Sequence, residues 1–172
     1  VRTRWDNGHL MVVHEDYTRV MAVPCDMEIA GYDTDHVDTL RLWQARSPKP
    51  IDMKLFSQGQ YLQASEERAM ADAISQVLYP EDNHYEGKSL RLKQQYFFCC
   101  ASLQDMIKNY KLVHGNDFSH FADFNAIQLN DTHPVISIPE LIRQLTRYEG
   151  VSFDDALNIA KKTFAYTNHT IL

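Results

Sequence analysis

One stretch decides the fold, residues 125–140, which read Asn125-Ala126-Ile127-Gln128-Leu129-Asn130-Asp131-Thr132-His133-Pro134-Val135-Ile136-Ser137-Ile138-Pro139-Glu140. Its first part predicts an apolar strand that ends in a cluster of hydrogen-bonding and titratable side chains. Its last part predicts the start of a helix. Open α/β sheets bind ligands beyond the carboxyl ends of their strands, because side chains and free helix N-termini converge there. The stretch therefore favours an α/β fold with a site at the end of this strand.

Two helices are predicted after that strand. Ser137 and Glu140 match a capping box, in which the serine accepts from the third helical amide and the glutamate reaches back. This helix is expected to run to about Tyr148, where Gly150 ends it, and residues 152–162 predict the second helix.

A second strand, predicted over residues 163–167, delivers Asn168, His169 and Thr170. Two strands that end in polar clusters, with helices between them, are typical of the βαβ units of a doubly wound sheet. We therefore expect the two clusters to lie at neighbouring strand ends.

The N-terminal part predicts short strands. Residues 2–5 and 9–13 flank Asn7-Gly8, a pair that tolerates the positive φ of a tight hairpin turn. Residues 18–23 alternate in polarity and predict a third strand, so the three strands are expected to form a β-meander. Residues 39–43 predict a further strand.

The middle of the chain predicts two long helices. Residues 59–79 contain few helix breakers and carry their apolar residues mainly in the second half, which favours either a helix that projects at one end or an ordinary surface helix. Pro80 ends it, and residues 81–88 predict a polar loop. Residues 89–110 predict a buried core helix, and residues 114–124 a loop.

Composition excludes several classes of protein. The 172 residues suffice for one domain with a sizeable core, and a net charge of −6 without lysine or arginine runs argues against a nucleic-acid partner. No stretch approaches the length of a membrane span. Cys25, Cys99 and Cys100 predict reduced, mostly buried thiols and a cytoplasmic location. The chain ends inside element-like patterns, which predicts a piece of a longer polypeptide.

Candidate chemistry centres on Asp131, His133 and His169, at the ends of the two strands. They predict a polar pocket, although each of the three could instead be structural. With or without His120 they could also supply the nitrogen and oxygen ligands of a metallohydrolase, although their spacing matches no strong metal pattern. No Gly-x-Ser-x-Gly elbow and no phosphate-cradling glycine-rich loop is present.

Four separated motifs carry a family resemblance. They are Tyr79-Pro80-x-Asp82-Asn83-x-x-Glu86-Gly87-Lys88-x-Leu90-Arg91-Leu92-Lys93-Gln94, Leu129-Asn130-Asp131-Thr132-His133-Pro134, Ile138-Pro139-Glu140-Leu141 and Ala165-Tyr166-Thr167-Asn168-His169-Thr170. In this order they resemble the signatures of the α-glucan phosphorylases, the family of glycogen, starch and maltodextrin phosphorylases. The resemblance covers the chain from about Val20 but corresponds to an internal part of the family's longer polypeptide.

The resemblance implies a fold and a reaction. The fold is a GT-B-type glycosyltransferase, with residues 1–172 as part of its Rossmann-like N-terminal domain and the C-terminal domain missing. The reaction is retaining phosphorolysis of terminal α-1,4-glucosidic bonds of a glucan by inorganic phosphate, which yields glucose 1-phosphate. The implied cofactor is pyridoxal phosphate, held by a lysine outside this chain, so no residue here is expected to bind it. Alone, the chain is expected to be inactive.

The resemblance also implies site residues. Asn83 is similar to the asparagine that bonds the sugar from a gate loop, residues 80–88, and Asp82 to the acid that occupies the phosphate site when that gate is closed. His84 replaces a common aromatic residue at the pocket mouth.

On the sugar-facing wall, His169 is similar to the histidine beside the sugar's 6-hydroxyl group. Asp131 is similar to the aspartate beneath the sugar, with His133 and Thr170 near it. These residues are expected to position the substrate and stabilise an oxocarbenium-like transition state rather than to shuttle protons.

Residues 59–79 are similar to the family's tower helix, which implies a homodimer formed through that helix. Sliding of the helix would then move the gate. Lys108-Asn109 stands where regulated animal members carry paired arginines for AMP, so allosteric control by AMP is left open. A free-standing glucan-binding or dimerisation module remains the alternative to a phosphorylase part, and the choice between glycogen and maltodextrin is also left open.

Overall fold

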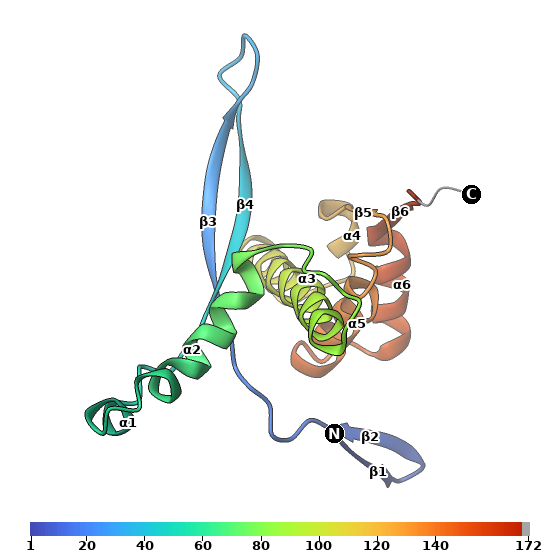
Figure 1. The fold of residues 1–172 in the computed structure, drawn as a ribbon. Coiled ribbons are helices and arrows are strands. Elements are labelled where there is room, and N and C mark those ends of the chain that lie inside the picture. Colours follow the sequence, from blue (N-terminus) through green and yellow to red (C-terminus); the bar gives the residue numbers. More distant parts are fainter. Residues whose placement is uncertain (170–172) are drawn as a thin grey trace.

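The computed structural model describes residues 1–169, which form a mixed α/β arrangement with three separate two-stranded sheets (Figure 1). In chain order the elements are β1 (Arg2–Asp6), β2 (His9–Val13), β3 (Met21–Ala30), β4 (Val37–Arg46), α1 (Met53–Ser57), α2 (Tyr61–Gln76), α3 (Tyr85–His114), α4 (Phe121–Phe124), β5 (Ile127–Asn130), α5 (Ser137–Tyr148), α6 (Phe153–Thr163) and β6 (Phe164–Thr167).

The compact body of the molecule consists of α3 to α6 with β5 and β6 (Figure 1). Helix α3 lies on the side of this body that faces α2 and the β3–β4 ribbon. The β3–β4 ribbon and the α1–α2 arm extend from this body in different directions, and the β1–β2 hairpin lies apart from both. Within residues 1–169 no helix is both long enough and apolar enough to cross a membrane.

The N-terminal hairpin is confirmed, but the predicted meander is wrong. Asn7 and Gly8 have φ values of 48° and 81° at the β1–β2 turn. Strand β3 pairs antiparallel with β4 instead of β2, in a register that runs from Met21 opposite Arg46 to Ala30 opposite Val37. A meander needs a tight reversal after β2, whereas residues 14–20 form a link without strand structure. The ribbon instead buries Ala45 and part of Trp43 beside Ile74 and Phe97 of the helices.

The helix predicted over residues 59–79 is observed as α2. Its buried side chains, Ala64, Ala71 and Ile74, are small or medium in size, and Ser75 Oγ accepts a hydrogen bond of 2.8 Å from the backbone of Ala45 in β4. The apolar stripe expected in its second half is only partly buried, because Met70 stays 59% exposed. Near the start of α2, Leu62 is 87% exposed. The helix therefore presents apolar surface to solvent.

Helix α3 begins four residues earlier than predicted, at Tyr85. His84 is its N-cap, and the His84 Nδ1 atom accepts a hydrogen bond of 3.0 Å from the backbone N–H of Gly87. The last part of the predicted loop is thus the first turn of the helix. This cap was missed because histidine is not among the residues usually favoured at such positions.

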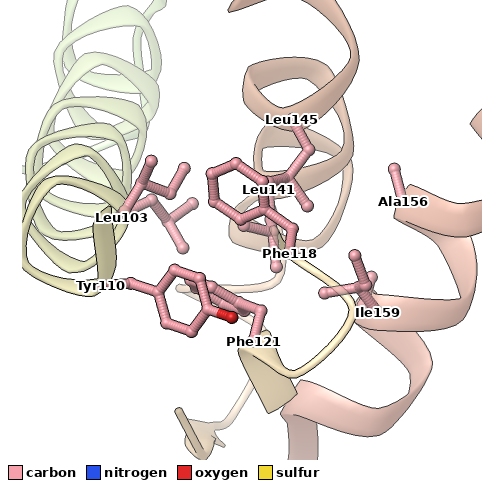
Figure 2. Close-up of a cluster of buried hydrophobic side chains, with 10 residues drawn as sticks. Leu103, Tyr110, Phe118, Phe121, Leu141, Leu145, Ala156 and Ile159 are labelled. Atoms are coloured by element: carbon pink, nitrogen blue, oxygen red, sulfur yellow. The ribbon is translucent and has the colours of Figure 1, made fainter. Parts of the chain in front are cut away.

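The main core is a cluster of side chains between α3, α5, α6 and the segment around α4 (Figure 2). Helix α3 contributes Leu103, Ile107 and Tyr110, whose hydroxyl donates to the carbonyl of Asp117 over 2.6 Å. Leu141 and Leu145 of α5 are fully buried. Each such leucine stabilises the fold by about 1.5–3 kcal/mol through the removal of apolar surface from water.

The predicted βαβ unit is confirmed at its core. Strands β5 and β6 pair in parallel, from Ile127 opposite Phe164 to Asn130 opposite Thr167, and α5 and α6 lie between them in the chain. The second helix begins where it was predicted, and Ser152 caps it, since its hydroxyl accepts from the backbone N–H of Asp155 over 3.2 Å.

The capping box predicted for α5 is wrong. Ser137 lies inside the helix, and its hydroxyl donates to the carbonyl of Pro134 over 2.5 Å. Glu140 points into the protein instead of back to the helix start. The turn at Pro134 places Ser137 one position too far along the chain to accept from the helical amides.

Glu140 joins α5 to α3. Arg143 donates two hydrogen bonds of 2.7 Å to its carboxylate, while Gln144 and the Cys100 thiol donate to Oε1 over 2.8 and 3.2 Å. Burial raises the pKa of Glu140, but these donors outweigh burial and hold the pKa below its usual value. The ionised carboxylate therefore stabilises the folded state.

The cysteine prediction holds only in part. All three thiols are free, but Cys25 is exposed, whereas Cys99 and Cys100 are half-buried. Cys25 lies on β3, where every residue except the half-buried Ala22 is exposed, because the β3–β4 ribbon extends away from the helices (Figure 1).

We predict that Glu140→Gln lowers the free energy of unfolding at pH 7 by about 1.5–3 kcal/mol, because hydrogen bonds to a charged acceptor are lost. A folded-state pKa below the unfolded one contributes stability above the unfolded value of about 4.3, and this contribution disappears as the pH falls through the folded pKa. Urea denaturation between pH 3 and 7 should show the difference from wild type shrinking below about pH 4.3.

The matched control is Glu66→Gln on the exposed face of α2, which is expected to change stability by less than about 0.5 kcal/mol. A deficit of Glu140→Gln that stayed constant down to pH 3 would contradict the role of the ionised carboxylate.

Candidate functional site

Asp131 occupies a constrained position directly after β5. Its φ of 65° lies in the left-handed region, and its backbone N–H donates to the carbonyl of Thr167 over 2.8 Å, which extends the β5–β6 pairing by one bond. Among the described residues its Oδ1 is a buried side-chain atom without a hydrogen-bond partner. A buried, unpaired carboxylate oxygen is costly, so this atom is suited to accept a hydrogen bond from a bound molecule.

His133 lies beside this carboxylate and faces a second segment. Its Nε2 is 3.9 Å from Asp131 Oδ2, and its ring meets the ring of Tyr79 edge to face, with centroids 5.6 Å apart. A pocket of about 180 Å³ opens here, lined by residues of α3, by Leu78 and Tyr79, and by His133 and Pro134. The loop after β5 and the segment before α3 therefore share one wall.

The first turns of α3 hold the segment of residues 77–84. Gln94, which is buried, donates from Nε2 to the carbonyl of Val77 over 2.7 Å. Arg91 Nη1 donates to Asp82 Oδ2 over 2.7 Å, and the Arg91 guanidinium lies 5.4 Å from the centroid of the Tyr79 ring. Both ends of the segment are thus tied to the same helix.

Gly87 permits the close approach of this segment. A Cβ atom at Gly87 would lie 1.8 Å from the carbonyl oxygen of Glu81, a distance at which no side chain fits. Asn83, which is exposed, donates from Nδ2 to Glu81 Oε1 over 2.6 Å. Asn83 and Asp82 therefore sit on a loop whose base is packed against α3.

The predicted residues on the second strand are placed only in part. His169 is exposed two residues beyond Thr167, whose carbonyl is bonded to Asp131. Thr170 lies outside the described residues. The structure brings Asp131 and His133 together and sets the end of β6 beside them.

Arg91, Gln94 and Tyr79 were missed as site residues by the sequence reasoning. The available signal was the spacing of Arg91 and Gln94, which places both on one face of α3 toward the preceding loop. Cys99 lines the same pocket, and burial raises the pKa of its thiol to about 11. It is therefore protonated near neutral pH and unsuited to act as a nucleophile.

The metallohydrolase alternative gains no support. Across residues 1–169, no three His, Cys, Asp or Glu side chains form a group that could hold a metal ion. His120, the additional ligand considered, is paired with Asp123 over 2.8 Å.

Comparison with known proteins identifies the family. Residues 1–172 match the family described as carbohydrate phosphorylase over their whole length. The chain belongs to the carbohydrate phosphorylase family. The brain form of glycogen phosphorylase from Mus musculus is 49% identical over 160 residues, which cover 89% of this chain and 19% of that protein. The liver form from Homo sapiens is 47% identical over the same share of each.

The chain therefore spans about a fifth of the length of these phosphorylases. The resemblance carried by the four motifs is confirmed, and membership of the phosphorylase family is favoured over a free-standing binding module. The roles expected for individual site residues remain predictions.

We predict that Gly87→Ala destabilises the protein by about 1–3 kcal/mol, because the added methyl group meets the backbone of Glu81 and forces the loop or the helix to shift. Chemical denaturation followed by circular dichroism measures this change. Lys88→Ala, at the exposed neighbouring position of α3, is the control and should change stability by no more than about 0.5 kcal/mol. Equal stability of the two variants would show that the loop does not need the close approach.

Proposed function

We propose that this chain forms the sugar-facing part of an α-glucan phosphorylase. In this reaction inorganic phosphate cleaves the terminal α-1,4-glucosidic bond of a glucan with retention, which yields glucose 1-phosphate. The observation that carries the proposal is the buried Oδ1 atom of Asp131, which lacks a partner among the described residues. A sugar hydroxyl group is a donor that would satisfy it. The family match over the whole chain supports the same reading.

The surrounding fold is proposed to be the Rossmann-like N-terminal domain of a GT-B-type enzyme, of which residues 1–172 are a part. The parallel β5–β6 pair with intervening helices supports this, because such units build doubly wound sheets. The C-terminal domain that completes the active-site cleft is then a required partner.

In this proposal the residues of the chain bind and orient the sugar. Asp131 and His133 form its lower wall, His169 contacts it from beyond the end of β6, and Thr170 is assigned a contact by the family resemblance alone. Asn83 reaches it from the gate loop, in which Asp82 is the acid that competes with phosphate when the gate is closed. Hydrogen bonds and dipoles held in place by the fold favour the oxocarbenium-like transition state because they need no reorganisation during the reaction.

The cofactor expected for the family is pyridoxal phosphate, whose phosphate group supplies proton exchange with the phosphate substrate. The residues of the pocket beside His133 do not fit a covalent site for it, because no lysine is among the lining residues. We assign the lysine to the part of the enzyme outside this chain and place no step of the reaction on the cofactor here.

We predict that Asn83→Ala, made in the full-length polypeptide that contains this chain, lowers kcat/KM for phosphorolysis about 10- to 100-fold, because a hydrogen bond to the reacting sugar is lost. The measurement is glucose 1-phosphate release from maltoheptaose and inorganic phosphate. Asn109→Ala, on the exposed surface of α3, is the control and should retain wild-type activity. No glucose 1-phosphate from the wild-type polypeptide would refute the proposed function.

A homodimer through α2 is part of the proposal. Leu62 and Met70, about two turns apart on this helix, expose 87% and 59% of their surface, and the helix extends from the body of the molecule (Figure 1). An exposed apolar helix face of this kind is suited to pack against its copy.

We predict that Leu62→Glu in the full-length polypeptide shifts the protein from dimer to monomer, because a buried, unpaired charge is costly at an interface. Sedimentation velocity measures the shift. Leu112→Glu, at a position of α3 that is 75% exposed, is the control and should leave the dimer intact. A dimer unaffected by Leu62→Glu would exclude α2 as the interface.

A further inference from the structure

Arg91 lies between the proposed gate and the body of the protein. Its guanidinium donates to Asp82 over 2.7 Å and lies 5.4 Å from the centroid of the Tyr79 ring. The side chain of Arg91 is 26% exposed and that of Asp82 is 47% exposed, so the pair is partly shielded from water. A guanidinium that contacts both a carboxylate and an aromatic face is held more firmly than a lysine would be.

The contacts of Arg91 continue to the sugar-facing wall. Tyr79 meets His133 edge to face at 5.6 Å, and His133 lies 3.9 Å from Asp131. On the other side, Gln94 holds the carbonyl of Val77 over 2.7 Å. One face of α3 therefore contacts Asp82 and the residues that precede it, while Asn83 remains exposed.

Charge gives this arrangement a consequence for phosphate. Inorganic phosphate is an anion, and a carboxylate near its site would compete with it or repel it. A carboxylate that is paired with Arg91 on α3 is neutralised and held on this side of the cleft. Loss of the Arg91–Asp82 pair would leave the charge of the Asp82 carboxylate uncompensated and would release the loop from α3.

We propose that Arg91 is a positioning residue for phosphorolysis, which retains the Asp82 carboxylate on α3 and so keeps the gate loop in the arrangement that admits phosphate. The inference rests on the proposed function, since it takes Asp82 as the competing acid. The proposal assigns Arg91 no contact with sugar or phosphate. It acts on phosphate binding through Asp82.

The test is a double-mutant cycle in the full-length polypeptide with its cofactor. Arg91→Met keeps much of the apolar stem and removes the cation, and it should raise KM for inorganic phosphate about threefold to tenfold. The kcat at saturating phosphate should change less than about twofold, since saturating phosphate outcompetes the acid. Arg91→Lys, which keeps the charge without the planar fork, should fall between Arg91→Met and wild type.

Asp82→Asn removes the competing charge, so Arg91→Met made in that background should change KM for phosphate by less than about twofold. Arg147→Met is the matched control, because Arg147 is an exposed arginine that also lies beside a tyrosine ring, that of Tyr148. It should leave KM for phosphate unchanged.

An equal rise in KM in both backgrounds would show that Arg91 acts independently of Asp82 and would overturn the inference. A fall in KM for Arg91→Met would overturn it too, because the pair would then hold the acid in the way of phosphate. An unchanged KM would have the same meaning.

A second measurement does not need turnover. Amide hydrogen exchange over residues 77–84, followed by mass spectrometry, should be about threefold to tenfold faster in Arg91→Met and in Asp82→Asn than in wild type. The double variant should exchange at the same rate as the single variants. Unchanged exchange would refute the positioning role even in a protein without phosphorylase activity. Failure of the proposed function alone would be seen as absent glucose 1-phosphate from the wild type.

Discussion

The packing of α3 against α5 and α6 is the interaction on which the rest of the structure depends. Leu103, Ile107 and Tyr110 of α3 meet the buried leucines of α5 and the small residues of α6 in one continuous cluster (Figure 2). Glu140 adds hydrogen bonds to the same contact, because its ionised carboxylate accepts from Arg143 of α5 and from the Cys100 thiol of α3. Because this contact orients α3, it also orients everything attached to the two ends of that helix.

The functional geometry follows from the length of α3, whose thirty residues span about 45 Å. The C-terminal half packs in the main core, and the N-terminal half carries the contacts to the segment that precedes the helix. The segment that precedes the helix folds back onto its N-terminal half, where it contacts Arg91, Gln94 and the backbone of Gly87. Because α3 holds several residues of the segment 77–84, the tip of this loop keeps one position relative to the helix.

The other side of the site depends on strand pairing. The parallel register of β5 with β6 places the carbonyl of Thr167 so that it accepts from the backbone N–H of Asp131. Asp131 has a left-handed backbone conformation, and one of its carboxylate oxygens is buried. The strand ends and the gate segment then meet through His133 and Tyr79. The proposed sugar wall and the proposed gate segment are thereby in direct contact within one short chain.

The sequence by itself determined the local elements and the family. Turn chemistry at Asn7-Gly8, the helix stop at Gly150 and the apolar run into Asp131 depend on neighbouring residues, so the first hairpin, the division between α5 and α6 and the β5–β6 unit could be predicted. Only the tertiary structure decided where β3 pairs, what Glu140 binds and which residues hold Asp82. Pairing of β3 with β4 brings Ala45 and Trp43 against distant helices. Glu140 accepts hydrogen bonds from Arg143 and from the Cys100 thiol of α3 instead of capping α5. Arg91 pairs with Asp82, nine positions earlier in the chain, across a chain reversal, and this contact depends on how the loop packs rather than on any local propensity.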